Sequence, residues 1–115
     1  MPLPHSLRFS QLSASRQVLV RLSQRVNYGS ILSVQVADGD VCFHTPPKVI
    51  FDVKLDADVT QRHELGLTDF ALPAESCRLL AQIDSLKNGV VEKIVVHDGI
   101  PRRVVLRGRC PEAHT

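Results

Sequence analysis

Residues 27–39 read Asn27-Tyr28-Gly29-Ser30-Ile31-Leu32-Ser33-Val34-Gln35-Val36-Ala37-Asp38-Gly39, and this stretch decides the fold. Residues 87–99 repeat its pattern at an offset of 60 as Lys87-Asn88-Gly89-Val90-Val91-Glu92-Lys93-Ile94-Val95-Val96-His97-Asp98-Gly99. Both copies have a glycine, an alternating apolar run and an Asp-Gly pair. Similarity at a fixed offset predicts one supersecondary unit used twice, with each copy contributing to a shared core.

The first copy predicts a β-hairpin over residues 31–45, because Asp-Gly between β-branched residues is the strongest short-range signal for a two-residue type I′ turn. In the expected register Val36 faces Val41 and Gln35 faces Cys42, and the next inward pair joins residues 34 and 43. One face is expected to be apolar and to carry Leu32, Val34, Val36, Val41 and Phe43. The other is expected to be polar and to carry Ser33, Gln35, Asp40, Cys42 and His44.

The second copy predicts a hairpin over residues 90–107. Its expected pairs are Val96 with Pro101, Ile94 with Arg103 and Val95 with Arg102. Both of its faces contain apolar residues, with Val91, Val95, Val104 and Leu106 on one side and Val90, Ile94, Val96 and Val105 on the other. Two apolar faces indicate a central place in the sheet or a contact with another subunit.

A helix is expected before each hairpin, over residues 13–27 and 73–87. Leu12, Leu19, Leu22 and Val26 form an apolar stripe in the first, and Leu79, Leu80, Ile83 and Leu86 do so in the second. Ser13 or Ser15 is the expected N-cap of the first helix, and Gly29 the residue that ends it in a left-handed conformation. Pro73 suits the first turn of the second helix.

The remaining segments complete a single-domain prediction for residues 1–115. Residues 1–10 are expected to form a loose arm, and 13–48 and 73–110 the two α-β-β units. Residues 49–72 are expected to contribute an extra strand over 49–55 and an acidic connection with a helical turn near 64–67. The predicted class is α+β, with two layers: two helices on one face of a four- or five-stranded, mainly antiparallel sheet.

Composition and charge restrict the class of protein. At 115 residues and 43% apolar content the chain is large enough to bury a core. Three widely separated cysteines indicate free thiols and hence a reducing, cytoplasmic location. Neither a signal peptide nor a membrane span is expected from the sequence. The net charge is +4 over residues 1–37, −5 over 38–75 and +3 over 76–115, which indicates intramolecular neutralisation, self-association, or a basic face for a polyanion.

The two Gly-to-Asp-Gly stretches, each preceded by a helix, resemble the YezD-like family of small bacterial proteins. The similarity covers Asn27 to Gly39 and Asn88 to Gly99 with Arg107, and residues 48–72 fall outside it. The resemblance implies the same helix-and-hairpin unit in both halves. It implies no activity, ligand or catalytic residue, because the family brings none with it.

Arginine residues give the chain its main candidate binding site. Those at the C-terminal strand and on the first helix together suit bidentate contact with phosphate, as in nucleic-acid binding: Arg21, Arg25, Arg102, Arg103, Arg107 and Arg109. Aromatic residues make up only 4% of the chain, which disfavours recognition of single strands by stacking. Basic residues on an edge strand also deter aggregation without any ligand.

Metal binding and catalysis receive less support from the sequence. Cys42 and His44 lie on the same side of a strand, with His63, Cys77 and His97 as more distant potential ligands, but the pair alone falls short of a metal site. Asp52, Asp56 and Asp58 alternate with Lys54 without a catalytic motif. No catalytic residue, metal ligand or cofactor is therefore assigned.

The function expected from sequence is that of a cytosolic binding or regulatory module without enzymatic activity. A homodimer formed through the last hairpin and an unidentified protein partner are the expected assemblies. The first alternative is a nucleic-acid-binding protein that uses the arginine-rich strand. The second is a small enzyme that uses the acidic central segment.

Overall fold

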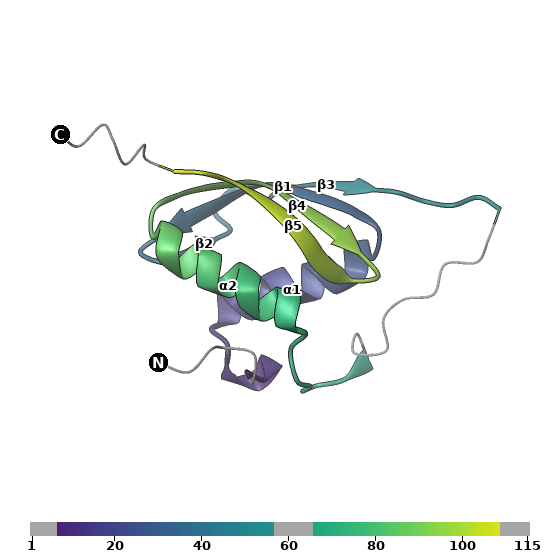
Figure 1. Ribbon diagram of the computed structural model, residues 1–115, viewed down its shortest axis with the longest axis horizontal. Helices are drawn as coiled ribbons and strands as arrows, with labels where there is room; N and C mark the ends of the chain where they lie inside the picture. Colours follow the sequence, from purple (N-terminus) through teal and green to yellow (C-terminus); the bar gives the residue numbers. More distant parts are fainter. Residues whose placement is uncertain (1–6, 57–65, 109–115) are drawn as a thin grey trace.

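The computed structural model describes residues 7–56 and 66–108, and these form two layers (Figure 1). Helices α1 (Ala14–Val26) and α2 (Ala74–Leu86) cover one face of a five-stranded antiparallel sheet. Its strands are β1 (Gly29–Ala37), β2 (Asp40–Cys42), β3 (Lys48–Phe51), β4 (Gly89–His97) and β5 (Ile100–Arg107). The predicted α+β class is confirmed.

Strands β1 and β4 pair at the centre of the sheet, with Ile31 opposite Ile94. Gly29 lies opposite Val96, and Val36 lies opposite Gly89. Adding 60 to Gly29 gives Gly89, and subtracting 60 from Val96 gives Val36, so the repeat offset converts the first pair into the second. The two strands therefore occupy equivalent positions about the middle of the sheet.

Each Asp-Gly turn is bound to the end of the other unit's helix. The N–H of Gly39 donates to the carbonyl oxygen of Lys87 at 2.8 Å, and the N–H of Gly99 donates to that of Asn27 at 2.9 Å. Asn27 and Lys87 are the C-caps, with φ of 62° and 60°. The prediction that Gly29 ends α1 is wrong, because the helix has already ended two residues earlier and Gly29 belongs to β1.

Strands β2 and β3 both pair with β1 on the edge that faces away from β4. The segment predicted as an extra strand over 49–55 therefore continues the first hairpin, beyond an interruption at Pro46-Pro47. The ladder ends at Phe51, because its partner Gly29 is the first residue of β1. The expected pairing of residues 34 and 43 is also wrong, since β2 ends at Cys42.

The turn of the first hairpin is as predicted, but its apolar face agrees with the prediction only near the turn. Val36 faces Val41 and Gln35 faces Cys42, as expected. Ser33, however, has a φ of 61° and breaks the alternation of β1. Ile31 and Val34 are consequently both buried, at 0% and 1% exposure, while Leu32 is only half-buried on the opposite face.

In the second hairpin only the pair nearest the turn agrees with the prediction. Val96 faces Pro101, whereas Ile94 faces Val104 and Val95 faces Arg103. The register shifts between Val95 and Val96, because β5 has one extra residue there, a β-bulge. The register shifts again between Val91 and Lys93, where β4 has one extra residue, so Val91 and Ile94 both belong to the core face and Val95 to the other. The predicted division of this hairpin's apolar residues between two faces is therefore wrong.

The core lies between the helices and the central strands. Its most deeply buried side chains come from both units: Leu19, Ile31, Val34, Cys77, Leu80, Ile83, Val91, Ile94 and Val96. The helices agree closely with the predicted ranges, and the Ser13 side chain accepts a hydrogen bond from the N–H of Arg16 as the N-cap. Leu12, Leu22 and Leu86 lie at the margin of the core rather than within it.

Residues 7–11 are packed, which corrects part of the predicted loose arm; residues 1–6 lie outside the described residues. Phe9 begins the short 3-10 helix η2 (Phe9–Gln11) and stacks on Phe70 at 5.0 Å between ring centroids. The guanidinium carbon of Arg21 lies 4.4 Å from the centroid of the Phe9 ring. The predicted turn near 64–67 also falls mostly outside the described residues.

We expect this N-terminal segment to loosen in acid. Arg8 Nε donates to Asp69 Oδ2 at 2.9 Å, and with the N–H of Ser10 it lowers the pKa of Asp69 to about 2. Because this value lies below the 3.8 of the free side chain, the stabilisation is present above pH 3.8 and is lost as the pH falls towards 2. The ring NMR signals of Phe9 and Phe70 should shift within that window.

The Asp69→Asn variant is the control for this prediction. Its ring signals should not titrate between pH 4 and 2, since the carboxylate is gone. An unchanged titration in the variant would show that another group loosens the segment.

Candidate binding surface

The face of the sheet opposite the helices is uncovered by any described element (Figure 1). The strand registers arrange its side chains in three rows that cross the sheet. The rows are Ile50–Ser30–Val95–Arg103, Lys48–Leu32–Lys93–Val105 and Cys42–Gln35–Val90–Arg107. We call these twelve residues, with Glu92, the open face.

The open face combines apolar area with positive charge. Val105 and Ile50 are 43% and 51% exposed, and the other aliphatic side chains of the rows are half-buried. Four cationic side chains stand against one carboxylate, which gives the open face a net charge of +3: Lys48, Lys93, Arg103 and Arg107 against Glu92. Such a surface suits a partner that offers both carboxylates and apolar side chains.

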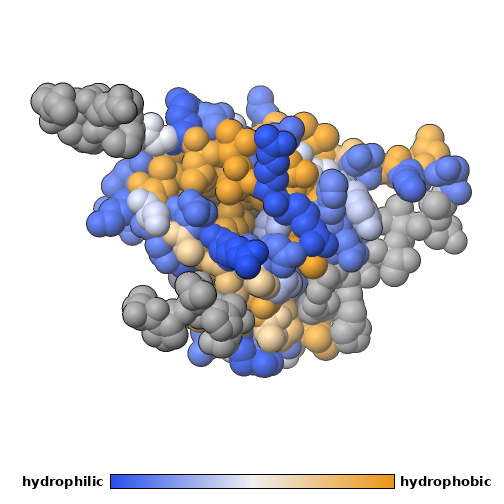
Figure 2. Space-filling model, viewed as in Figure 1, coloured by the Kyte–Doolittle hydropathy of each residue, from blue (hydrophilic) through white to orange (hydrophobic). Residues whose placement is uncertain are grey.

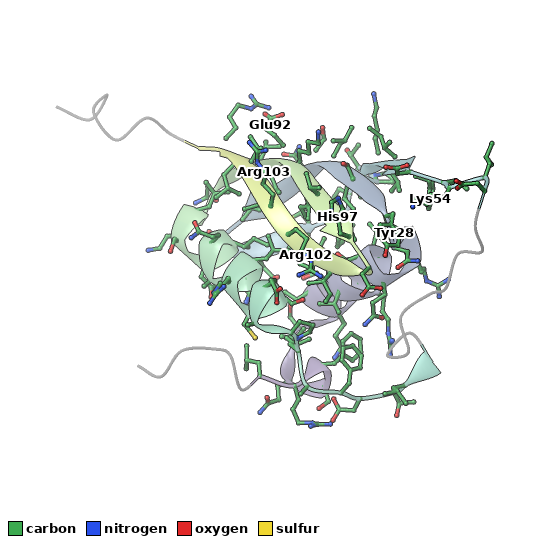
Figure 3. All side chains as sticks on the ribbon, turned by 45° about the vertical axis from the view of Figure 1, so that its right-hand side comes forward. Tyr28, Lys54, Glu92, His97, Arg102 and Arg103 are labelled. Carbon is green, nitrogen blue, oxygen red and sulfur yellow. The ribbon has the colours of Figure 1, made fainter. Side chains whose placement is uncertain are left out.

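The four cationic side chains of the open face differ in whether they form an ion pair. Arg107 forms an ion pair with Glu92. Lys48, Lys93 and Arg103 form no ion pair within the described parts of the chain. Figure 3 shows Arg103 and Glu92 on the side of the sheet away from the helices. Three cations therefore point to solvent on this face.

A shallow groove of about 360 Å³ lies at the β3 end of the open face. Ile50 and Val95 form part of its apolar wall, and Lys93 and His97 contribute polar groups. The His97 ring lies 6.1 Å from the ring of Tyr28, centroid to centroid (Figure 3). The groove gives the open face a concave end.

The six predicted arginines do not form one surface. Arg103 and Arg107 are on the open face, whereas Arg102 occupies the bulge and donates to Glu75 on α2 at 2.8 Å. Arg21 packs on Phe9 and Phe70 and donates to the Leu67 carbonyl. Arg25 is exposed on α1, and Arg109 lies outside the described residues. The sheet therefore separates Arg103 and Arg107 from Arg21, and phosphate binding by the arginines stays a prediction.

Among the four cations of the open face, sequence reasoning missed Lys48 and Lys93. The signal that identifies Lys93 is the offset of 60: once β1 and β4 are paired symmetrically, Lys93 must lie opposite Leu32. Lys48 had no such signal, because its position depends on the return of β3 to the edge of β1.

A second, polar cleft of about 720 Å³ lies beside the Asp38-Gly39 turn. Arg16 donates there to the Gly39 carbonyl at 2.6 Å and forms ion pairs with Asp40 and Asp84. Partial burial would raise the pKa of Asp40, but hydrogen bonds from Ser15, Val41 and Ser13 and the charge of Arg16 outweigh it and lower the pKa. These charged side chains pair with one another and connect α1, the turn and α2.

A narrower groove runs between α2 and β5 on the helix side of the sheet. Figure 2 shows hydrophobic surface over β5 and between β5 and α2, crossed by hydrophilic side chains. Leu79 and Val104 line the groove together with the Arg102–Glu75 ion pair. This pair spans the groove and fastens β5 to α2.

The residues considered for metal binding and catalysis are dispersed. Cys42 is half-buried on β2, His44 is exposed beyond it, and Cys77 is buried in the core, where burial raises the pKa of its thiol. Asp52 and Asp56 are exposed, and His63 and Asp58 lie outside the described residues. Within residues 7–56 and 66–108 no three potential ligands converge on a metal position.

No family model, curated protein or solved structure matches this chain. None of the described helices has the length and apolar content needed to cross a membrane.

Proposed function

We propose that this chain is a cytosolic, non-catalytic binding module that attaches to an acidic protein surface through its open face. The observation that carries the proposal is the combination of exposed and half-buried aliphatic side chains with a net charge of +3 on a face that the helices leave uncovered. Protein interfaces typically have an apolar core and use arginine at contacts. The buried free thiol of Cys77 supports the cytosolic part of the proposal.

An acidic protein fits this face better than a nucleic acid does. The three rows contain no aromatic side chain on which a base would stack. Their aliphatic side chains, such as Leu32 and Val95, have no counterpart on a phosphate backbone. Two open faces would not pack against each other well, because four cations would meet four like charges.

The proposal is tested with a labelled short peptide of glutamate and leucine and with a DNA oligonucleotide of the same net charge. We expect Lys93→Glu with Arg103→Glu to weaken peptide binding about tenfold or more, since two exposed cations of the open face become anions. The charge-matched control is Arg25→Glu with Arg78→Glu, because both arginines are exposed on the helices. It should bind the peptide nearly as the unchanged protein does.

Two results would overturn the proposal. If both double variants weakened peptide binding equally, binding would depend only on the net charge of the protein. Tighter binding of the oligonucleotide than of the peptide, lost in the open-face variant, would favour the nucleic-acid alternative instead.

A further inference from the structure

The chain that follows β3 carries an exposed apolar stripe. Phe51, Val53 and Leu55 are 60%, 59% and 96% exposed. They alternate with Asp52 and Lys54, so the segment has the two-residue period of a strand with one apolar face and one charged face. We call residues 51–55 the β3 extension. Figure 2 shows hydrophobic surface at its tip, where Figure 1 places the chain leaving the sheet.

The backbone of the β3 extension is open to a further strand. The N–H of Asp52 donates to the carbonyl oxygen of Tyr28, the residue before β1, at 2.8 Å. No backbone hydrogen bond joins Val53, Lys54 or Leu55 to any other described residue. Exposed strand backbone next to apolar side chains is a template for pairing with another chain.

The sequence of the β3 extension is complementary to itself in one antiparallel register. We infer that two copies of this protein associate by pairing these segments about a two-fold axis at Val53. Phe51 then faces Leu55 of the second copy, and Val53 faces Val53. On the other side of the ribbon Asp52 faces Lys54 twice, once on each side of the axis. Opposite-charge and apolar cross-strand pairs are the units that stabilise a two-stranded ribbon.

Neighbouring registers lack this complementarity. A two-fold axis at Lys54 places two Lys54 side chains opposite each other and opposes Asp52 to Asp56. Like charges directly opposite one another destabilise a strand pair. The Val53-centred register is therefore selected by charge as well as by apolar contact. Because the ribbon is short, the dimer is weak and forms with increasing concentration.

The test is a charge exchange, followed by sedimentation velocity over a concentration series. The single variants Asp52→Lys and Lys54→Asp each create two like-charge pairs, and we expect each to weaken dimerisation about tenfold (about 1.4 kcal/mol). The double variant Asp52→Lys with Lys54→Asp restores opposite charges and should dimerise as the unchanged protein does. Both substitutions are at exposed positions, so folding is preserved in all three variants.

The result that would overturn the inference is a protein that stays monomeric at every concentration, or a dimer that the single variants leave unchanged. A monomer whose thermal stability falls strongly in Leu55→Asp would show that another part of the same chain covers the stripe, and would equally overturn it. The open-face variant Arg103→Glu, at a residue outside the groove that Asp52 and Val53 line, should dimerise normally. This separates failure of the dimer from failure of the proposed function.

Discussion

Replacing Gly29 by alanine is expected to lower the free energy of unfolding by about 3 kcal/mol and the melting temperature by roughly 15 °C. A Cβ at this position would lie 1.9 Å from the carbonyl oxygen of Ile50, which is backbone and cannot rotate away. The φ of Gly29 is 151°, a backbone conformation that residues with a side chain rarely adopt. Either β3 leaves β1, or the start of β1 is distorted.

Gly66→Ala is the matched control, because no atom lies within 4 Å of the Cβ it would add. Thermal unfolding of the two variants should therefore differ widely. A Gly29→Ala variant as stable as the control would contradict the close approach of β3 to β1 described here.

The second large effect is expected in the core at the centre of the sheet. Ile31→Ala and Ile94→Ala should each cost about 3 kcal/mol, because both side chains are fully buried and lie opposite each other. Leu32→Ala should cost less than about 1 kcal/mol, since Leu32 is half-buried on the open face. Denaturant unfolding measures all three. A larger loss in Leu32→Ala than in Ile31→Ala would mean that Ser33 does not reverse the alternation of β1.

The sequence contained most of the architecture. The helices follow from the apolar stripes, and the turns from Asp38-Gly39 and Asp98-Gly99, because these signals are local. The symmetric pairing of Gly29 with Val96 follows from the repeat once the two units are placed side by side. The origin of the two units by duplication stays a prediction, as does the resemblance to the YezD-like family.

The features that the sequence does not predict depend on contacts between residues far apart in the chain. The positive φ of Ser33 and the bulge at Arg102 change the faces of β1 and β5, and neither residue type signals such an irregularity. Of the four arginines predicted together at the last strand, Arg103 and Arg107 fall on the open face and Arg102 occupies the bulge, while Arg109 lies outside the described residues. Strand pairing places the cations Lys48 and Lys93 on the open face as well.

Binding at the open face is tested directly by mapping the backbone amide shifts of the isotope-labelled protein during titration with the glutamate–leucine peptide. We expect the amides of Leu32, Lys93, Val95 and Arg103 to shift together while those on the exposed sides of α1 and α2 do not. Shifts confined to the helices, or no shifts at all, would contradict the assignment of the open face as the binding surface.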